Sequence, residues 1–134
     1  MKHKGIFLLM LIFSLFSCDR FHENNYDFPK HITFPAEGGT QHHYGGVGCP
    51  DCTDFFIFEN DEHDENKRVF PQGIGDTVVA CYDWLTVQGE KFKDGLTITA
   101  APNTSKSPRF LTIKIYTSAL EYGYIKVRQN GKTE

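Results

Sequence analysis

The chain has 134 residues, which is room for one domain with its own core and too little for two. Its 14 basic and 17 acidic residues give a net charge of −3 at pH 7. Proteins that hold the phosphates of nucleic acid carry a surplus of lysine and arginine, so this balance predicts no nucleic-acid partner.

Residues 1–17 have the pattern of an export signal. Lys2 and Lys4 form a basic head, residues 6–16 form an apolar body, and a small residue, Ser17, precedes a cysteine. The apolar body is about half as long as the roughly 20 residues that a membrane-spanning helix needs. We therefore predict a cleaved signal peptide. Its removal leaves 12 basic residues against the 17 acidic ones, a net charge of −5.

The tetrad Leu15-Phe16-Ser17-Cys18 resembles the lipobox of bacterial lipoproteins. In that class the cysteine receives acyl chains such as palmitate and becomes the new N-terminus after cleavage. The resemblance implies that Cys18 is a lipidation site. It also implies that the protein is anchored in the bacterial cell envelope, at the outer membrane, facing either the periplasm or the cell surface. The alternative is an ordinary secretory signal in which Cys18 happens to lie near the cleavage point.

Residues 18–30 are polar, rich in asparagine and without a steady period, so we predict a flexible tether. Its aromatic residues Phe21, Tyr26 and Phe28 leave open that the second half docks on the domain. The predicted domain is residues 31–131, beginning with two short strands, at 31–34 and 41–44, around a turn.

Residues 45–76 interrupt the regular spacing and predict an insertion, in which only the apolar run 55–58 has the length of a buried strand. After it the strand pattern returns with short spacing. In residues 110–116, for example, Leu111, Ile113 and Ile115 alternate with polar residues. No helical stripe occurs outside the signal, so an all-β sandwich is the predicted fold. The five further runs are Thr77–Tyr82, Trp84–Val87, Leu96–Ala100, Arg109–Tyr116 and Tyr122–Gln129.

Several of these stretches resemble the BACON family of bacterial immunoglobulin-like domains. They are Trp84-Leu85-Thr86-Val87, the strand from Leu96, Asn103, Arg109, the ending Ile125 to Gly131, and the opening turn Ala36-Glu37-Gly38-Gly39. Two features depart from the family: the long segment 45–76, and Phe110-Leu111 where a glycine often follows the arginine.

The resemblance implies an immunoglobulin-like β-sandwich of about seven to nine strands. The family is named for a proposed carbohydrate-binding role, so the resemblance also implies a non-enzymatic domain with a glycan or mucin as its partner. The alternative is a structural or protein–protein interaction module of a surface complex.

Three cysteines remain beside Cys18, an odd set for an oxidising compartment. We expect one disulfide, from Cys49 or Cys52 to Cys81, which would close a loop of about 30 residues. The Cys49-Pro50-Asp51-Cys52 spacing also fits a redox dithiol, but no helix follows it. Together with His42 or His43 the cysteines have the ligand types of zinc without a second paired spacing.

Residues 59–65 contain five carboxylates, enough oxygen for calcium but not in a calcium-loop register, so we expect a solvated loop. A mobile run of acids is also unsuited to glycoside hydrolysis, which needs two fixed carboxyl groups. The chain has no nucleophile or phosphate-loop motif. We therefore predict no catalytic residue, metal or cofactor.

The last hairpin carries the candidate ligand face. With residues 117–121 as its turn, Tyr116 lies opposite Tyr122 and Lys114 opposite Tyr124, while Arg128 lies near Phe110. Aromatic faces stack on sugar rings, and lysine and arginine donate to hydroxyls or sulfates. The alternative is that these cross-strand pairs only stabilise the sheet, and Trp84 is likewise either exposed or part of the core. The candidate ligand-binding residues are Lys114, Tyr116, Tyr122, Tyr124 and Arg128.

Overall fold

The computed structural model describes residues 20–46 and 51–134. The predicted signal peptide, Cys18 and Cys49 lie outside these residues. Among the described residues, no helix has the length and apolar character needed to cross a membrane.

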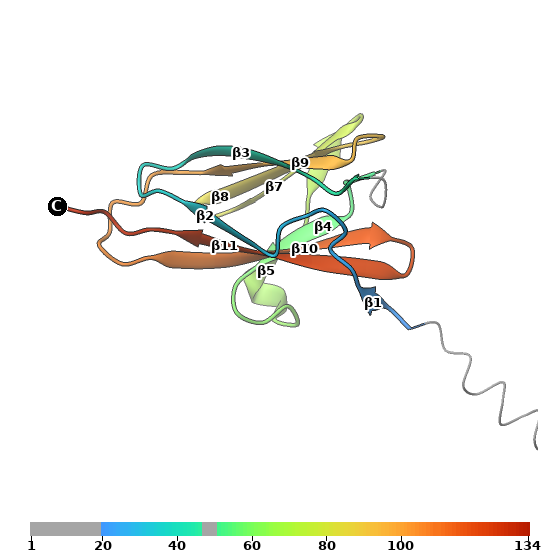
Figure 1. Ribbon diagram of the computed structural model, residues 1–134, viewed down its shortest axis with the longest axis horizontal. Coiled ribbons are helices and arrows are strands. Elements are labelled where there is room, and N and C mark those ends of the chain that lie inside the picture. The colour runs from blue at the N-terminus through green and yellow to red at the C-terminus, as the bar shows by residue number, and fades with distance from the viewer. Residues whose placement is uncertain (1–19, 47–50) are drawn as a thin grey trace, which may run out of the picture.

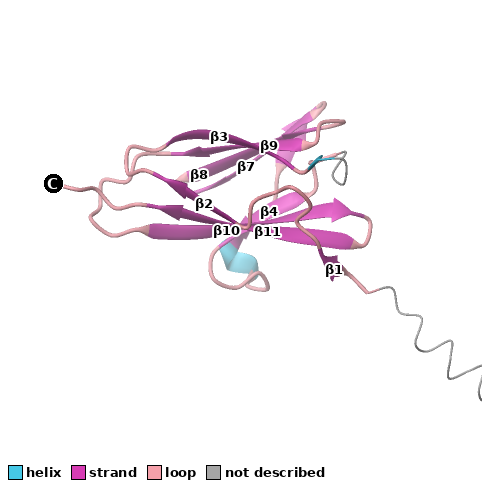
Figure 2. Cartoon of the chain, viewed as in Figure 1, coloured by secondary structure: helices cyan, strands magenta, loops and turns pink. Residues whose placement is uncertain are grey.

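Two β-sheets pack face to face, which confirms the predicted all-β sandwich (Figure 1). Sheet A has the order β1-β11-β10-β4-β5, with β2 also paired to β11, and sheet B has the order β3-β9-β8-β7-β6. The strands of sheet A are β1 His22–Glu23, β2 His31–Phe34, β4 Phe55–Phe58, β5 Arg68–Val69, β10 Arg109–Ser118 and β11 Glu121–Gln129. Those of sheet B are β3 Gly39–Tyr44, β6 Gln72–Ile74, β7 Thr77–Tyr82, β8 Leu85–Glu90 and β9 Gly95–Ala100. A short 3₁₀ helix, η2 Glu65–Lys67, lies beside sheet A (Figure 2).

The core lies between the sheets and follows the alternation of the sequence. On β10 the buried residues are Leu111, Ile113 and Ile115, as predicted, and β9 and β8 contribute from the opposite sheet. Each large apolar side chain that is fully buried contributes about 1.5–3 kcal/mol relative to an exposed one. Trp84 is also buried, with the guanidinium of Arg109 4.8 Å from its ring centroid, so the core alternative holds for this residue.

The segment 45–76, predicted as an insertion, takes part in both sheets. It supplies β4 and β5 to sheet A and β6 to sheet B. All four residues of β4 are buried because the strand has β10 beside it and is covered on both faces. Phe55 and Ile57 belong to the core, whereas Phe56 and Phe58 lie under other aromatic rings on the outer face.

The segment predicted as a flexible tether is docked from residue 22 onward. Strand β1 pairs in parallel with the start of β11. The buried side chain of Asn25 donates to the backbone oxygen of Tyr124 (2.7 Å) and accepts from its nitrogen (3.1 Å). Phe28 is only 3% exposed and belongs to the core. The second half of this segment therefore docks on the domain, which is the alternative that its aromatic residues suggested.

The structure does not show the predicted disulfide between Cys52 and Cys81, and the alternative partner, Cys49, lies outside the described residues. On β7 the side chain of Ala80 is buried, and the next residue, Cys81, is exposed and unbridged. Cys52 is fully buried in the core. Because neighbouring residues of a strand point to opposite faces, Cys81 lies on the outer face of sheet B, where a buried thiol does not reach it.

Candidate functional site

The outward-facing side chains of β10 and β11 form rows across sheet A. The pairs Tyr116–Tyr122, Lys114–Tyr124 and Phe110–Arg128 have the predicted register. The turn between the strands is shorter than predicted, because β10 continues to Ser118 past a bulge after Tyr116. The side-chain face proposed from sequence therefore exists, with one irregularity at its hairpin end.

Lys114 lies at the centre of an aromatic group that we call the lysine cluster, formed by Lys114, Tyr116, Tyr122, Tyr124 and Glu62. The Lys114 ammonium is 4.5 Å from the ring centroid of Tyr122 and 5.5 Å from the centroids of the other two tyrosines. Its nitrogen is 2.6 Å from a carboxylate oxygen of Glu62. Because its charge is already paired and its side chain is 14% exposed, Lys114 holds the cluster together and does not offer itself to a ligand.

Glu62 comes from the loop predicted to be solvated, and it was not a sequence candidate. Its other carboxylate oxygen accepts a hydrogen bond from the Tyr124 hydroxyl at 2.7 Å. Burial alone would raise the pKa of Glu62, but the hydrogen bonds from Lys114 and Tyr124 reverse this and lower it. Burial, followed by the hydrogen bond to Glu62, raises the pKa of Tyr124. At neutral pH the cluster therefore holds an ionised carboxylate and a protonated phenol.

Two other carboxylates of the acidic loop, Asp61 and Asp64, make local contacts. A carboxylate oxygen of Asp64 accepts from the backbone nitrogen of Asn66, and one of Asp61 accepts from that of His63. In the described part of the chain, no three side chains of metal-ligating type come together.

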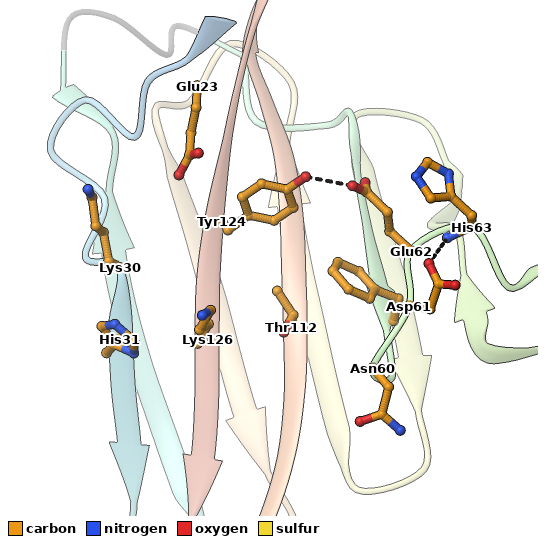
Figure 3. Close-up of a pocket in the computed structure, with 11 residues that line it drawn as sticks. Glu23, Lys30, His31, Asn60, Asp61, Glu62, His63, Thr112, Tyr124 and Lys126 are labelled. Carbon is orange, nitrogen blue, oxygen red and sulfur yellow. Dashed lines mark hydrogen bonds between the residues drawn. The ribbon is translucent and has the colours of Figure 1, made fainter.

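Beside the lysine cluster, a groove of about 500 Å³ crosses the outer face of sheet A (Figure 3). Its floor is a row of paired residues from four strands, His31, Lys126, Thr112 and Phe58. Residues 60–63 form one wall, and Lys30 and Glu23 stand on the other side. Tyr124 belongs to both the groove and the cluster. The volume falls within the range of pockets that hold small molecules, about 300–1,000 Å³.

The groove offers hydrogen-bond donors that the protein does not use. Lys126 and Lys30 line it, and among the described residues neither side chain has an ion pair or a hydrogen bond. The imidazole of His31 and the hydroxyl of Thr112 face the same space. The tyrosine ring beside these groups is held by Glu62. The arrangement can therefore bind a polar ligand of several hydroxyls against an aromatic surface.

Arg128 lies apart from the other four sequence candidates. It is exposed, its guanidinium is 5.6 Å from the ring centroid of Phe110, and the two line a second hollow of about 380 Å³. This hollow adjoins the groove, since His31 and Lys126 line both. Sequence reasoning missed Lys126 although strand alternation places it on the same face as Tyr124 and Arg128.

Comparison with known proteins identifies the second half of the chain. Residues 76–130 match the family model of BACON, described as "Putative binding domain, N-terminal". That segment, less than half of the chain, is similar to the BACON family. The BACON segment comprises β7 to β11, so it supplies Thr112, Tyr124 and Lys126 of the groove. The walls, from residues 23–31 and 60–63, lie outside the matched segment.

Two solved structures show weaker likeness. The first, "NMR structure of the protein from Bacteroides thetaiotaomicron", has 16% identity and a TM-score of 0.49, covering 86% of this chain and 88% of the other. The second, "Bacteroides ovatus GH5 xyloglucanase in complex with a XXXG heptasaccharide", has 17% identity and a TM-score of 0.46, covering 78% of this chain and 18% of the other. No curated protein matches the chain. At these scores the fold assignment rests on the strands and sheets described above.

Proposed function

We propose that this protein is a non-enzymatic lipoprotein of the bacterial cell envelope, anchored through Cys18, whose BACON domain binds carbohydrate. The observation that supports ligand binding most directly is the groove on sheet A, where unpaired lysines and a fixed tyrosine ring share one hollow. A sugar ring presents an apolar CH face and hydroxyl groups, and it needs both kinds of partner. The lipobox-like tetrad supports the anchor.

The state of Glu62 supports binding without hydrolysis. A glycosidase needs one carboxylic acid that keeps its proton at working pH, which requires a raised pKa. The pKa of Glu62 is lowered, and both of its oxygens are already engaged by Lys114 and Tyr124. Glu62 therefore positions the tyrosine and does not donate a proton to a glycosidic oxygen.

The test is a glycan array with the soluble domain, residues 19–134, and two matched variants. Lys126→Ala removes a groove donor without breaking any contact among the described residues. Lys132→Ala removes an exposed lysine near the C-terminus that does not line the groove. We expect one class of glycan to bind the parent and the Lys132 variant, with at least tenfold weaker binding by the Lys126 variant. Equal binding by all three proteins would contradict the groove as the site.

A second function, a protein-interaction module, has one specific feature in its favour. Strand β3 pairs only with β9, so its other edge is open, and its side chains are half-buried to exposed. Open edges can accept a strand from a partner. An empty glycan array together with a stoichiometric envelope partner captured by crosslinking would favour this function over carbohydrate binding.

A further inference from the structure

The two ends of the sandwich differ in character. Eight large apolar side chains are exposed on the described residues, and five of them belong to the end where β10 turns into β11. The opposite end, which carries the C-terminus, is made mainly of short polar loops, including residues 102–108. The five residues are Phe21, Tyr26, Tyr44, Phe92 and Leu120.

Hydrogen bonds and strand pairing place these side chains at one end. The backbone nitrogen of His22 donates to the oxygen of Leu120, so Phe21 lies next to the hairpin turn. The Tyr26 hydroxyl donates to Glu121, the residue after Leu120. Tyr44 ends β3 opposite Gly95, and Phe92 lies in the loop just before that glycine. Each sheet therefore contributes to the apolar end.

Phe92 is the most exposed of these side chains, at 81%. Its backbone φ of +62° is in the left-handed region, which bulky residues rarely occupy. Lys91 and Lys93 flank it, and the Lys91 ammonium is 5.8 Å from its ring centroid. Because the Phe92 ring stays in water between two lysines, it contributes no burial energy to the folded domain. Backbone strain and exposed apolar side chains concentrate at surfaces that contact other molecules.

Chain length identifies that surface. Cys18 is four residues before His22, and four residues span at most about 14 Å. His22 is held at the hairpin end by its pairing with Glu121. Because the predicted tether is docked, an acyl group on Cys18 would start within that distance of His22, which is hydrogen-bonded to Leu120. The polar headgroup layer of a bilayer is about 5–8 Å thick on each side. Because the segment between Cys18 and His22 is so short, this end of the domain would contact the membrane.

We propose that the end of the sandwich bearing Phe21, Phe92 and Leu120 is a membrane-docking surface that rests in the headgroup layer of the bilayer. This inference depends on the proposed Cys18 anchor but not on carbohydrate binding. Aromatic and leucine side chains enter the boundary between headgroups and acyl chains, while Lys91, beside Phe92, reaches a lipid phosphate; Lys93 is paired with Glu90. The docked domain stands with its strands rising from the membrane, so that the groove on sheet A faces sideways.

The test uses the full lipidated protein in vesicles of phosphatidylethanolamine and phosphatidylglycerol whose acyl chains carry bromine, which quenches nearby tryptophan fluorescence. Phe92→Trp places a reporter at the proposed surface, and Phe110→Trp places one at the start of β10, near the opposite end. Both variants keep the buried Trp84 as a common background. We expect at least a twofold loss of the added fluorescence for Phe92→Trp and none for Phe110→Trp.

The outcomes separate the inference from the anchor on which it depends. Equal quenching of both reporters, or none, in protein that floats with the vesicles would leave the anchor standing and overturn the docking surface. Protein that does not float at all would overturn both. A Leu120→Trp reporter should also be quenched by the brominated lipids. Adding Phe92→Asn to it weakens docking, so its fluorescence should recover while the protein stays anchored to the vesicles. Asparagine tolerates the left-handed backbone, so this substitution preserves the fold.

Discussion

Glu62 contacts residues that are 52 and 62 positions away in the sequence, Lys114 and Tyr124. One carboxylate fixes a lysine and a phenol, and through them it fixes the tyrosine ring that borders the groove. A half-buried lysine surrounded by aromatic rings is stable only with such a partner. The role of Glu62 was not predictable, because a carboxylate within an acidic run has the sequence pattern of a solvated loop.

The lowered pKa of Glu62 predicts a specific pH dependence. A carboxyl group with a depressed folded-state pKa stabilises the protein fully above its unfolded pKa of about 4.3, and this contribution is lost as the pH falls through the folded value. Glu62→Gln should therefore lower the free energy of unfolding at pH 7, and this difference from the parent should shrink as the pH falls below the unfolded pKa. Urea unfolding at several pH values measures this.

The matched control is Glu65→Gln, which removes a carboxylate that is 83% exposed and pairs only with Arg68. Its unfolding free energy should stay within about 0.5 kcal/mol of the parent at every pH. A Glu62 variant whose curve runs parallel to the parent from pH 7 to pH 3 would show that its carboxylate does not supply the acid-sensitive stability.

At the scale of elements, the eight longer strands were predictable and the three shortest were not. Strands such as β10 and β11 have enough residues for alternation to show, and their register followed from pairing around a turn. Strands β1, β5 and β6 have only two or three residues each, too few for a period. The docking of β1 depends instead on contacts with β11, among them those of Asn25, whose side chain lies against Gly123.

Gly123 provides a test of how β1 docks. A Cβ atom added there would lie 2.7 Å from the Asn25 side-chain oxygen, closer than Cβ atoms of folded proteins approach another heavy atom. Gly123→Ala should therefore cost about 1–3 kcal/mol of stability through overpacking. It should also speed hydrogen exchange of residues 22–25, which would be pushed away from the sheet.

A double-mutant cycle separates this contact from a general effect on β11. In an Asn25→Ala background the clash with the side-chain oxygen is gone and the contact with the backbone Cα of residue 25, at 3.0 Å, remains. The penalty of Gly123→Ala should therefore shrink by about 1 kcal/mol. Additive effects of the two substitutions would mean that Asn25 is not what excludes a side chain at position 123.

At the scale of the whole molecule, the structure predicts that the stable unit starts before residue 31. A chain beginning at residue 31 loses Phe28 from the core and the two hydrogen bonds of Asn25. Burial of one phenylalanine contributes about 1.5–3 kcal/mol, and each hydrogen bond about 0.5–1.5 kcal/mol. The shorter chain should unfold with a free energy about 3 kcal/mol or more below that of a chain beginning at residue 20.

Urea titration of the two chains measures this difference, and a chain that begins at residue 22 serves as control because it keeps β1 and Phe28. Equal unfolding free energies of all three chains would show that residues 20–30 do not stabilise the domain, as expected of the flexible tether predicted from sequence. The sequence pointed toward the tether because polarity and asparagine content describe solvation, whereas docking here depends on Phe28 and on contacts with β11, nearly a hundred residues away.

The parallel pairing of β1 and β2 with β11 has a mechanical consequence. All three strands run in one direction, from the hairpin end toward the C-terminal end. A force that pulls residue 20 one way and the C-terminal end the other slides β1 and β2 along β11, so that their interstrand hydrogen bonds bear the load together. A hairpin pulled from its open end would lose its bonds one pair at a time. Under such tension the sandwich resists by shear, and the rate of forced unfolding governs how long it lasts.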